Sequence, residues 1–365
     1  MRRRSGRITG GAETVSMTIA AAASAFPPHE YDQRVILSAL QRHWGPKVDN
    51  PVFLERLQAR VGVDKRHLAL PIEEYNDLKS WGRANNHWID VAQEIGETAL
   101  CRALTRAGLA PSDLDALFFV SITGISCPSI DVKLVNRMGL PLHLKRTPIF
   151  GLGCVAGAVG LSRAADYVRA YPGQVAAVLA VELCSLTLQQ EDISIANIIS
   201  SGLFGDGAAA VLVTGAERNG GGPEILATRS VLFPNSEHVL GWDISEKGFR
   251  MVLARELPEI VQEKLGPVVD AFLAERDLTR ADLGSWILHT GGPRVLEATA
   301  AALGLSEEDV SASWDCLRRE GNLSSASVLV VLEEVMLKRR PVPGTYGLLA
   351  AMGPGFSAEL VLLRW

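Results

Sequence analysis

The chain has 365 residues, of which 47% are hydrophobic and 21% are charged, as is usual for a globular protein with a sizeable core. This composition excludes a disordered chain, a collagen-like repeat and a small disulfide-stapled domain. Lysine and arginine number 36 against 41 aspartates and glutamates, which gives a net charge of −5. The chain therefore lacks the basic excess that is typical of nucleic-acid-binding proteins.

The cysteines indicate a reducing compartment. They are odd in number and form no CxxC pair, which fits neither a zinc site nor a disulfide framework: Cys101, Cys127, Cys154, Cys184 and Cys316. We therefore expect free thiols and a cytoplasmic protein. No run of about 18 apolar residues is present, so no membrane-spanning helix is expected.

The N-terminus resembles a signal peptide only superficially. Arg2, Arg3 and Arg4 are separated from the apolar stretch 17–26 by polar residues, whereas a signal peptide joins its charged and apolar parts directly. We expect residues 1–16 to form a flexible basic leader. The apolar stretch is then the first core strand, ending at Pro27-Pro28.

Strands and helices alternate along the first half of the chain. Apolar residues recur at helical spacing before Gly108, and a second predicted helix is rich in glycine and alanine and ends at Pro172-Gly173. The predicted elements are a helix at 90–107, strands at 116–122 and 148–151, the small-residue helix at 155–170, and buried strands within 174–185 and 205–215.

The second half repeats this order after a glycine-rich loop at 217–223, the best candidate for a boundary. The predicted elements are a helix at 257–276, a strand within 285–292, a helix at 294–303, a second small-residue helix at 324–338 and a closing strand at 347–351. This repetition predicts a duplicated α/β unit, with halves at 17–222 and 223–365.

One cysteine falls where a predicted strand meets a predicted helix. Cys154 lies in the sequence GLGCVAG, at the start of the first small-residue helix. The unsatisfied N–H groups of a helix N-terminus lower the pKa of a thiol and favour the nucleophilic thiolate. Cys154 is therefore a candidate nucleophile that we expect to be ionised at neutral pH. A buried, inert thiol is the simpler alternative.

Two polar residues of the second half also stand at the ends of predicted elements. His289 lies at the carboxyl end of a strand, where ligands collect in α/β proteins. Asn322 directly precedes the second small-residue helix. Considered singly, a structural histidine and an asparagine helix cap are the simpler interpretations.

Together, Cys154, His289 and Asn322 favour acyl-transfer chemistry. A thiolate–imidazolium pair supplies the nucleophile, and an amide beside it polarises a carbonyl group. The separation of the three residues in sequence requires the two halves to meet. A hydrolase of the Cys-His-Asn type is the competing interpretation, in which the asparagine would orient the histidine instead of the substrate.

Four motifs resemble those of the type III polyketide synthases, and they occur in that family's order. They are GCVAG around Cys154, HTGGPRVL around His289, GNLSSAS around Asn322, and MGPGF at 352–356. The resemblance covers nearly the whole chain after about Ser16. It implies a thiolase-like α/β fold, built as a duplicated αβαβα layered structure, and a homodimer.

The resemblance also implies a role for each of the three residues. Cys154 would hold the growing acyl chain, and His289 would keep its sulfur ionised. His289 and Asn322 would bind the malonyl thioester carbonyl, favour decarboxylation and stabilise the resulting enolate. CoA thioesters would be the substrates, and no metal or other cofactor would be required.

Further positions match the family's gate, cavity and CoA site. Phe204 matches an aromatic gatekeeper, and Met251 stands where the second gatekeeper is usually Phe. The remaining implied cavity positions are Cys127, Cys184, Thr187 and Ser324. Arg56 and Arg60 match residues that grip CoA phosphates, although Phe53 replaces a third basic residue. A solvated helix face is the other interpretation of these arginines.

The product is predicted from one position at which this chain differs from the tetrahydroxynaphthalene synthases. This chain resembles tetrahydroxynaphthalene synthases in VELCSL and GLFGD, but it has Ile122 where they have a cysteine. An apolar residue there is expected to disfavour five-unit growth from malonyl primers. We therefore expect an aliphatic acyl starter, carried by CoA or a carrier protein, malonyl-type extenders and an alkyl α-pyrone of the germicidin type.

Three alternatives to this predicted function stay open. A tetrahydroxynaphthalene-type synthase would grow the chain from malonyl units alone. A ketoacyl synthase III-like enzyme would condense once and hand its product to a carrier protein. A degenerate member of the family would bind ligands without catalysis.

Overall fold

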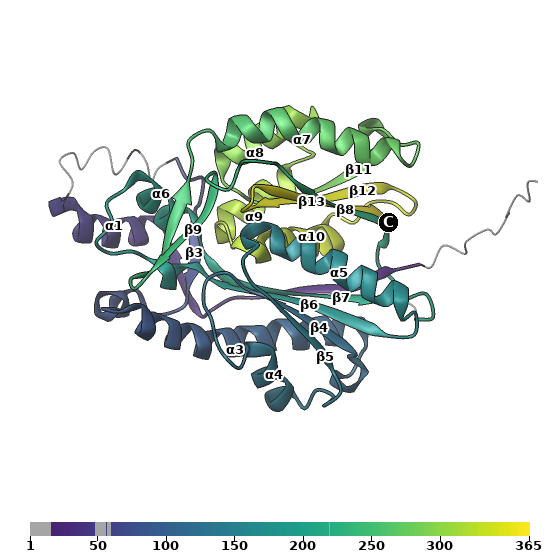
Figure 1. Ribbon diagram of the computed structural model, residues 1–365, viewed down its shortest axis with the longest axis horizontal. Helices are drawn as coiled ribbons and strands as arrows, with labels where there is room; N and C mark the ends of the chain where they lie inside the picture. Colours follow the sequence, from purple (N-terminus) through teal and green to yellow (C-terminus); the bar gives the residue numbers. More distant parts are fainter. Residues whose placement is uncertain (1–15, 48–55, 57–59, 219) are drawn as a thin grey trace, which may run out of the picture.

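The computed structural model describes residues 16–47, 56, 60–218 and 220–365. Helices and sheet stack in five layers (Figure 1). Helices α3 (Trp81–Ala107) and α4 (Ile130–Met138) cover one outer face, and α7 (Leu257–Ala274) and α8 (Pro293–Leu303) cover the other. Helices α5 (Ala156–Ala170) and α10 (Ser327–Lys338) fill the middle layer. This confirms the expected thiolase-like αβαβα layering.

The strands of both halves join into one nine-stranded sheet. Its order is β11-β12-β13-β8-β1-β7-β6-β4-β5. The strands are β1 (Thr18–Ala25), β4 (Ala116–Val120), β5 (Lys145–Ile149), β6 (Val175–Leu183), β7 (Asp206–Thr214), β8 (Glu224–Leu232), β11 (Leu283–Leu288), β12 (Tyr346–Gly353) and β13 (Ser357–Arg364).

The strand directions confirm the duplication. In the first half β4 runs parallel to β6, which is antiparallel to β7, which is antiparallel to β1. In the second half β11, β12, β13 and β8 repeat this series of directions. The two series meet where β1 pairs with β8 at Thr18 and Glu224. The loop predicted at 217–223 joins β7 to β8.

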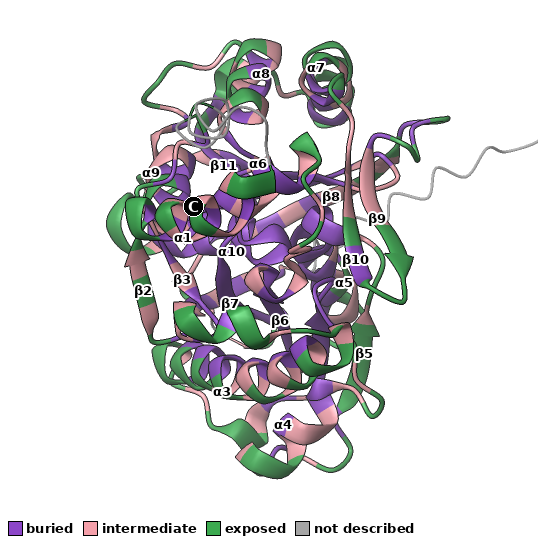
Figure 2. Cartoon of the chain, turned by 90° about the vertical axis from the view of Figure 1, so that its left-hand side faces the viewer, coloured by how far each residue is buried: buried purple, intermediate pink, exposed green. Residues whose placement is uncertain are grey.

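Close packing of the middle layer brings the two halves together. Every residue of β6 and β7 is buried, which explains their predominantly apolar sequences. Figure 2 shows buried residues along β6, β7 and α10, and exposed residues on the outer faces. A Cβ atom at Gly157 on α5 would lie 2.1 Å from the backbone oxygen of Ser325, so only glycine permits this approach.

Several elements differ from the prediction. Helix α3 begins at Trp81, nine residues earlier than expected, because Ser80 caps it and its first turns are polar. The strand at 347–351 does not close the fold, since β13 follows and lies inside the sheet. Several further elements were not predicted: α1 (Gln33–Trp44), α6 (Ile195–Leu203), α9 (Ser311–Glu320), and the hairpin of β9 (Leu240–Ser245) and β10 (Gly248–Leu253).

Two further points concern the ends of elements and of the chain. Both small-residue helices begin with 3-10 turns, at Gly153–Val155 and Ser324–Ala326, before the α-helical residues. The predicted leader at 1–16 lies outside the described residues except for Ser16. None of the helices within the described ranges is both long and apolar enough to cross a membrane.

Candidate active site

The first turns of the two middle-layer helices carry the predicted nucleophile and a serine from the other half. Cys154 is buried, and its sulfur donates a hydrogen bond to Ser324 Oγ at 3.5 Å. Ser324 has a left-handed backbone, with φ of 50°, and its N–H donates to Asn322 Oδ1 at 2.8 Å. Ser324 therefore links Cys154 to Asn322 across the junction of the halves.

The side chain of Asn322 is held in a defined orientation. Its Oδ1 accepts from the Ser324 N–H and from Ser327 Oγ at 3.2 Å. A backbone N–H only donates, so the oxygen must face it and the amide NH₂ is directed elsewhere. The backbone N–H of Asn322 also donates to the Leu203 carbonyl at 2.9 Å. Among the described residues, no acceptor takes a hydrogen bond from the Asn322 NH₂, which is left to act on a ligand.

His289 follows the last residue of β11, at the carboxyl end predicted from the sequence. Its N–H donates to the Ala350 carbonyl of β12 at 3.0 Å, and its ring is buried with Nδ1 unpaired. The turn after it packs on the end of α6, because a Cβ at Gly292 would lie 3.1 Å from the Leu203 side chain. In the described part of the chain, however, the Cys154 thiol is hydrogen-bonded to Ser324 and not to the imidazole of His289.

Two cavities adjoin this site. A cavity of about 30 Å³ is lined by Cys154, Ser324 and Pro354, with Ile122 and Thr123 in its wall. A second cavity of about 290 Å³ extends away from it beneath α1. Four side chains line both cavities and separate them: Phe204, Met251, Cys184 and Trp242.

The two predicted gatekeepers, Phe204 and Met251, thus stand at the boundary between the cavities. Cys184, another predicted cavity residue, lines both of them. Thr187 lines the larger cavity and donates to the Cys184 carbonyl at 2.7 Å. Trp242 was missed by the sequence analysis. It pairs with Met251 across the β9–β10 hairpin and donates to the Ile122 carbonyl at 3.1 Å. A hairpin of mixed polarity gave no signal for it.

Other predicted residues lie elsewhere. Cys127 is exposed and lines neither cavity, so its expected cavity position stays a prediction. Arg56 and Arg60 are exposed and also line neither cavity. Their contact with CoA stays a prediction, and Phe53 lies outside the described residues.

Burial dominates the electrostatics of the site. It raises the pKa of the Cys154 thiol to about 12, with a smaller rise from the charge of Glu182, while the Ser324 hydrogen bond acts in the opposite direction. Burial also lowers the pKa of His289 to about 4. Desolvation in the unliganded pocket thus opposes the expected thiolate, whereas the helix N-terminus favours it. Ionising the sulfur requires transfer of its proton.

Glu182 is a site residue that the sequence analysis missed. This fully buried carboxylate accepts from the Ile122 N–H at 3.1 Å, from Thr123 Oγ1 at 2.9 Å and from the Ser325 hydroxyl. Burial raises its pKa to about 7 despite these donors. It ties the end of β4 to the turn that carries Ser324. A single charged residue in the otherwise apolar strand β6 is the signal that marks it.

Comparisons with known proteins agree with this geometry. The chain matches the family models for chalcone and stilbene synthases, with the N-terminal domain over residues 16–217 and the C-terminal domain over 224–365. A 1,3,6,8-tetrahydroxynaphthalene synthase of Streptomyces peucetius subsp. caesius is 48% identical over 95% of this chain and 93% of its own length. A protein of Bacillus subtilis (strain 168) named as a putative chalcone synthase is 38% identical over 83% of this chain and 86% of its own length.

A solved structure points to the same family. The crystal structure of 1,3,6,8-tetrahydroxynaphthalene synthase from Streptomyces coelicolor A3(2), a bacterial type III polyketide synthase, matches with a TM-score of 0.91. It is 31% identical and covers 95% of this chain and 99% of its own. Type III polyketide synthases are acyltransferases that condense acyl units with decarboxylation. The chain belongs to the chalcone and stilbene synthase family and is a type III polyketide synthase.

The raised thiol pKa predicts how Cys154 reacts with an alkylating agent. Below its pKa the thiolate fraction grows about tenfold per pH unit, so reaction with iodoacetamide should be slow near about pH 7 and rise steeply towards about pH 10. Mass spectrometry of the Cys154 peptide measures the rate, with exposed Cys127 as the internal reference. A fast rate independent of pH over this range would show that an ion pair with His289 already exists.

Proposed function

We propose that Cys154 carries the acyl chain and that His289 and Asn322 activate the malonyl extender. The observation that supports this most directly is the Ser324 bridge, which joins the thiol of one half to the Asn322 amide of the other beside a cavity. In the loading step the Cys154 sulfur attacks the thioester carbonyl of the starter. Its proton passes to His289, the carbon–sulfur bond to CoA breaks, and the CoA thiolate leaves and takes that proton.

Extension begins with decarboxylation of malonyl-CoA. The bond to the carboxylate breaks, carbon dioxide leaves, and its electron pair forms an enolate on the thioester. The Asn322 NH₂ and the His289 ring would donate to the enolate oxygen, and one such donor is worth about 3 kcal/mol of barrier. The enolate carbon then attacks the acyl group and returns the sulfur of Cys154 as a thiolate. This chemistry needs no metal or redox cofactor, because carbon dioxide release drives it.

For the product, we propose aromatic growth from malonyl units of the tetrahydroxynaphthalene type. The support is the 48% identity to a 1,3,6,8-tetrahydroxynaphthalene synthase over nearly the whole chain. Ten carbons from five two-carbon units would be built in the cavity of about 290 Å³ beyond Phe204 and Met251. The relatives lend no support to the alkyl α-pyrone expected from the sequence.

An aliphatic starter remains the second candidate, on one observation. Ile122 lines the small cavity beside Cys154, so the wall at this point is apolar. An apolar wall favours an alkyl chain over the oxygen-rich chain of a malonyl primer. Release as an alkyl α-pyrone would follow from few extensions.

We propose that the enzyme works as a homodimer on CoA thioesters in the cytoplasm. Strand β5 is an edge strand whose first four residues are exposed, and Leu142 and Phe150 beside it are 93% and 47% exposed. Apolar exposure next to an unpaired edge suits pairing with a second copy. Arg56 and Arg60 are proposed to meet the CoA phosphates. All five cysteines are free, as expected in a reducing compartment.

Replacing the nucleophile tests the division of roles. In Cys154→Ala, polyketide formation should fall below detection, while release of carbon dioxide from malonyl-CoA should stay within about tenfold of wild type, because the donors remain. Asn322→Ala should instead lower decarboxylation by about 10²-fold or more. Labelled carbon dioxide and product mass spectrometry measure the two activities. Chain extension by Cys154→Ala at the wild-type rate would refute the nucleophile.

A competition between primers decides the product. With malonyl-CoA alone, wild type should form a ten-carbon aromatic product, and added octanoyl-CoA should not displace it. Mass spectrometry of the products measures both. Alkyl pyrones as the main products would support the second candidate. In that case Ile122→Cys should raise the aromatic fraction, whereas Met251→Phe should narrow starter choice towards short acyl groups.

The proposed assembly predicts a molar mass in solution of twice the 39.2 kDa of one chain. Light scattering after size-exclusion chromatography measures it. Leu142→Lys with Phe150→Lys should shift the protein towards the monomer, because two charges in an apolar contact are costly to bury. A wild-type monomer at micromolar concentration would contradict the proposal.

A further inference from the structure

The end of helix α6 carries Phe204 and is held by three other elements. The carbonyls of three successive residues, Gly202, Leu203 and Phe204, each accept one hydrogen bond. Gln33 Nε2 donates to the first at 2.7 Å, the Asn322 N–H to the second at 2.9 Å, and Arg66 Nη1 to the third. The last carbonyls of a helix lack partners within it and carry partial negative charge. A buried guanidinium is therefore a favourable cap.

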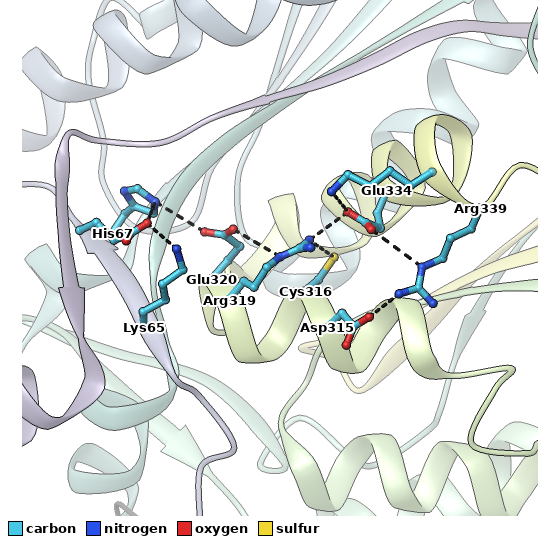
Figure 3. A network of polar contacts seen from close by, with 10 residues as sticks. Lys65, His67, Asp315, Cys316, Arg319, Glu320, Glu334 and Arg339 are labelled. Atoms are coloured by element: carbon cyan, nitrogen blue, oxygen red, sulfur yellow. Dashed lines mark hydrogen bonds and ion pairs between the residues drawn. The ribbon is translucent and has the colours of Figure 1, made fainter.

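Arg66 reaches this helix end because its strand alternates. In β3 (Lys65–Leu68) Arg66 and Leu68 point inwards, while Lys65 and His67 face a surface network. Figure 3 shows that network, in which Lys65 meets Glu30 at 2.8 Å and His67 lies 3.7 Å from Glu320. Glu320 ends α9, directly before Gly321 and Asn322. The outward-facing residues Lys65 and His67 thus hold β3 against the end of α9, and the Arg66 side chain points into the interior.

The stem of Arg66 also contacts the turn that carries Asn322. Gly321 has φ of 72°, and a Cβ there would lie 3.0 Å from Arg66 Cδ and 2.7 Å from the Leu203 carbonyl oxygen. Arg66 Nε donates to Gln33 Oε1 at 3.0 Å. The Arg66 side chain, only 2% exposed, therefore contacts three parts of the site. They are the Phe204 carbonyl, the turn at Gly321 that precedes Asn322, and Gln33, which also caps α6.

We propose that Arg66 is a positioning residue that holds the gate residue Phe204 and the amide of Asn322 in register with each other. This rests on the proposed roles of those two residues. Gly205 N–H donates to the Asn322 carbonyl at 3.0 Å, so the segment after Phe204 and the turn of Asn322 are also joined directly. Arg66 sets where that unit sits relative to β3. Loss of the guanidinium should therefore change both decarboxylation and starter choice.

The chemistry of Arg66 makes it a clean target. Burial lowers its pKa to about 10, so it stays charged at neutral pH. Within the described ranges it forms no ion pair with a carboxylate. The nearby carboxylate of Asp206 is satisfied by Ala69 N–H at 2.6 Å and Ser185 N–H at 2.8 Å. Replacing Arg66 by Met therefore keeps the buried stem and removes the donors together with the positive charge, which lowers the pKa of Asp206.

The test compares Arg66→Met with Arg106→Met. Arg106 also donates to a backbone carbonyl, that of Ala22, but it lies away from α6. We expect Arg66→Met to lower kcat for malonyl-CoA decarboxylation at least about tenfold with KM nearly unchanged, because displacing reacting groups by about 1 Å costs up to about 10²-fold. It should also alter the ratio of products from short and long acyl-CoA starters. Arg106→Met should change neither.

Two further variants keep the proposal testable if Arg66→Met does not fold. Arg66→Lys retains a charge and one donor, and should recover part of kcat and of the starter ratio. Gln33→Met removes only the Nε partner and the cap on Gly202, and should cause a smaller change in the same direction. The proposal is overturned if folded Arg66→Met has the same kcat and starter ratio as Arg106→Met. If Arg66→Met does not fold, the same result for both Gln33→Met and Arg66→Lys overturns it.

Failure of the proposed function gives a different result. If wild type releases no carbon dioxide from malonyl-CoA, or if Asn322→Ala releases it at the wild-type rate, the assigned chemistry fails irrespective of Arg66. If both behave as proposed and only the Arg66 variants are unaffected, the assigned chemistry stands and the positioning role alone is refuted.

Discussion

The close approach of the first turns of α5 and α10 is the contact on which the site depends. Gly157 allows the backbone of Ser325 to lie where a side chain would otherwise be. That approach puts Cys154 beside Ser324, and Ser324 beside Asn322. Each half of the duplicated unit alone would leave the end of its helix facing solvent. The site exists because the two halves of the chain, which repeat one structural unit, meet at these helix ends.

Burying this contact has an electrostatic consequence. The same packing that aligns Cys154 and Asn322 removes water from the thiol and from His289, and this burial favours the neutral form of both. Nearby, Glu182 is kept in the interior by its hydrogen bonds, but its pKa is raised to about 7. Burial in this site therefore opposes charge on each of these three groups before a substrate binds.

The proposed gate residue Phe204 and the proposed catalytic residue Asn322 are parts of one structural unit. Phe204 and Asn322 belong to different halves, yet their backbones are paired, and Arg66 and Gln33 cap the same helix end. The cavities on either side of Phe204 differ about tenfold in volume, at about 30 and 290 Å³. Small movements of this unit would therefore change which chains pass between the two cavities, as well as how the amide meets an enolate.

The sequence alone determined the duplicated α/β order, the buried strands and the positions of Cys154, His289 and Asn322 at element ends, because apolar periodicity, glycines and motif spacing are local. Only the tertiary structure decided that Trp242 and Glu182 belong to the site and that Arg66 faces inwards. Those outcomes follow from contacts between residues far apart in the chain. The pKa of Cys154 depends on the tertiary structure for the same reason, since desolvation depends on the whole surrounding fold and not only on the helix that carries the sulfur.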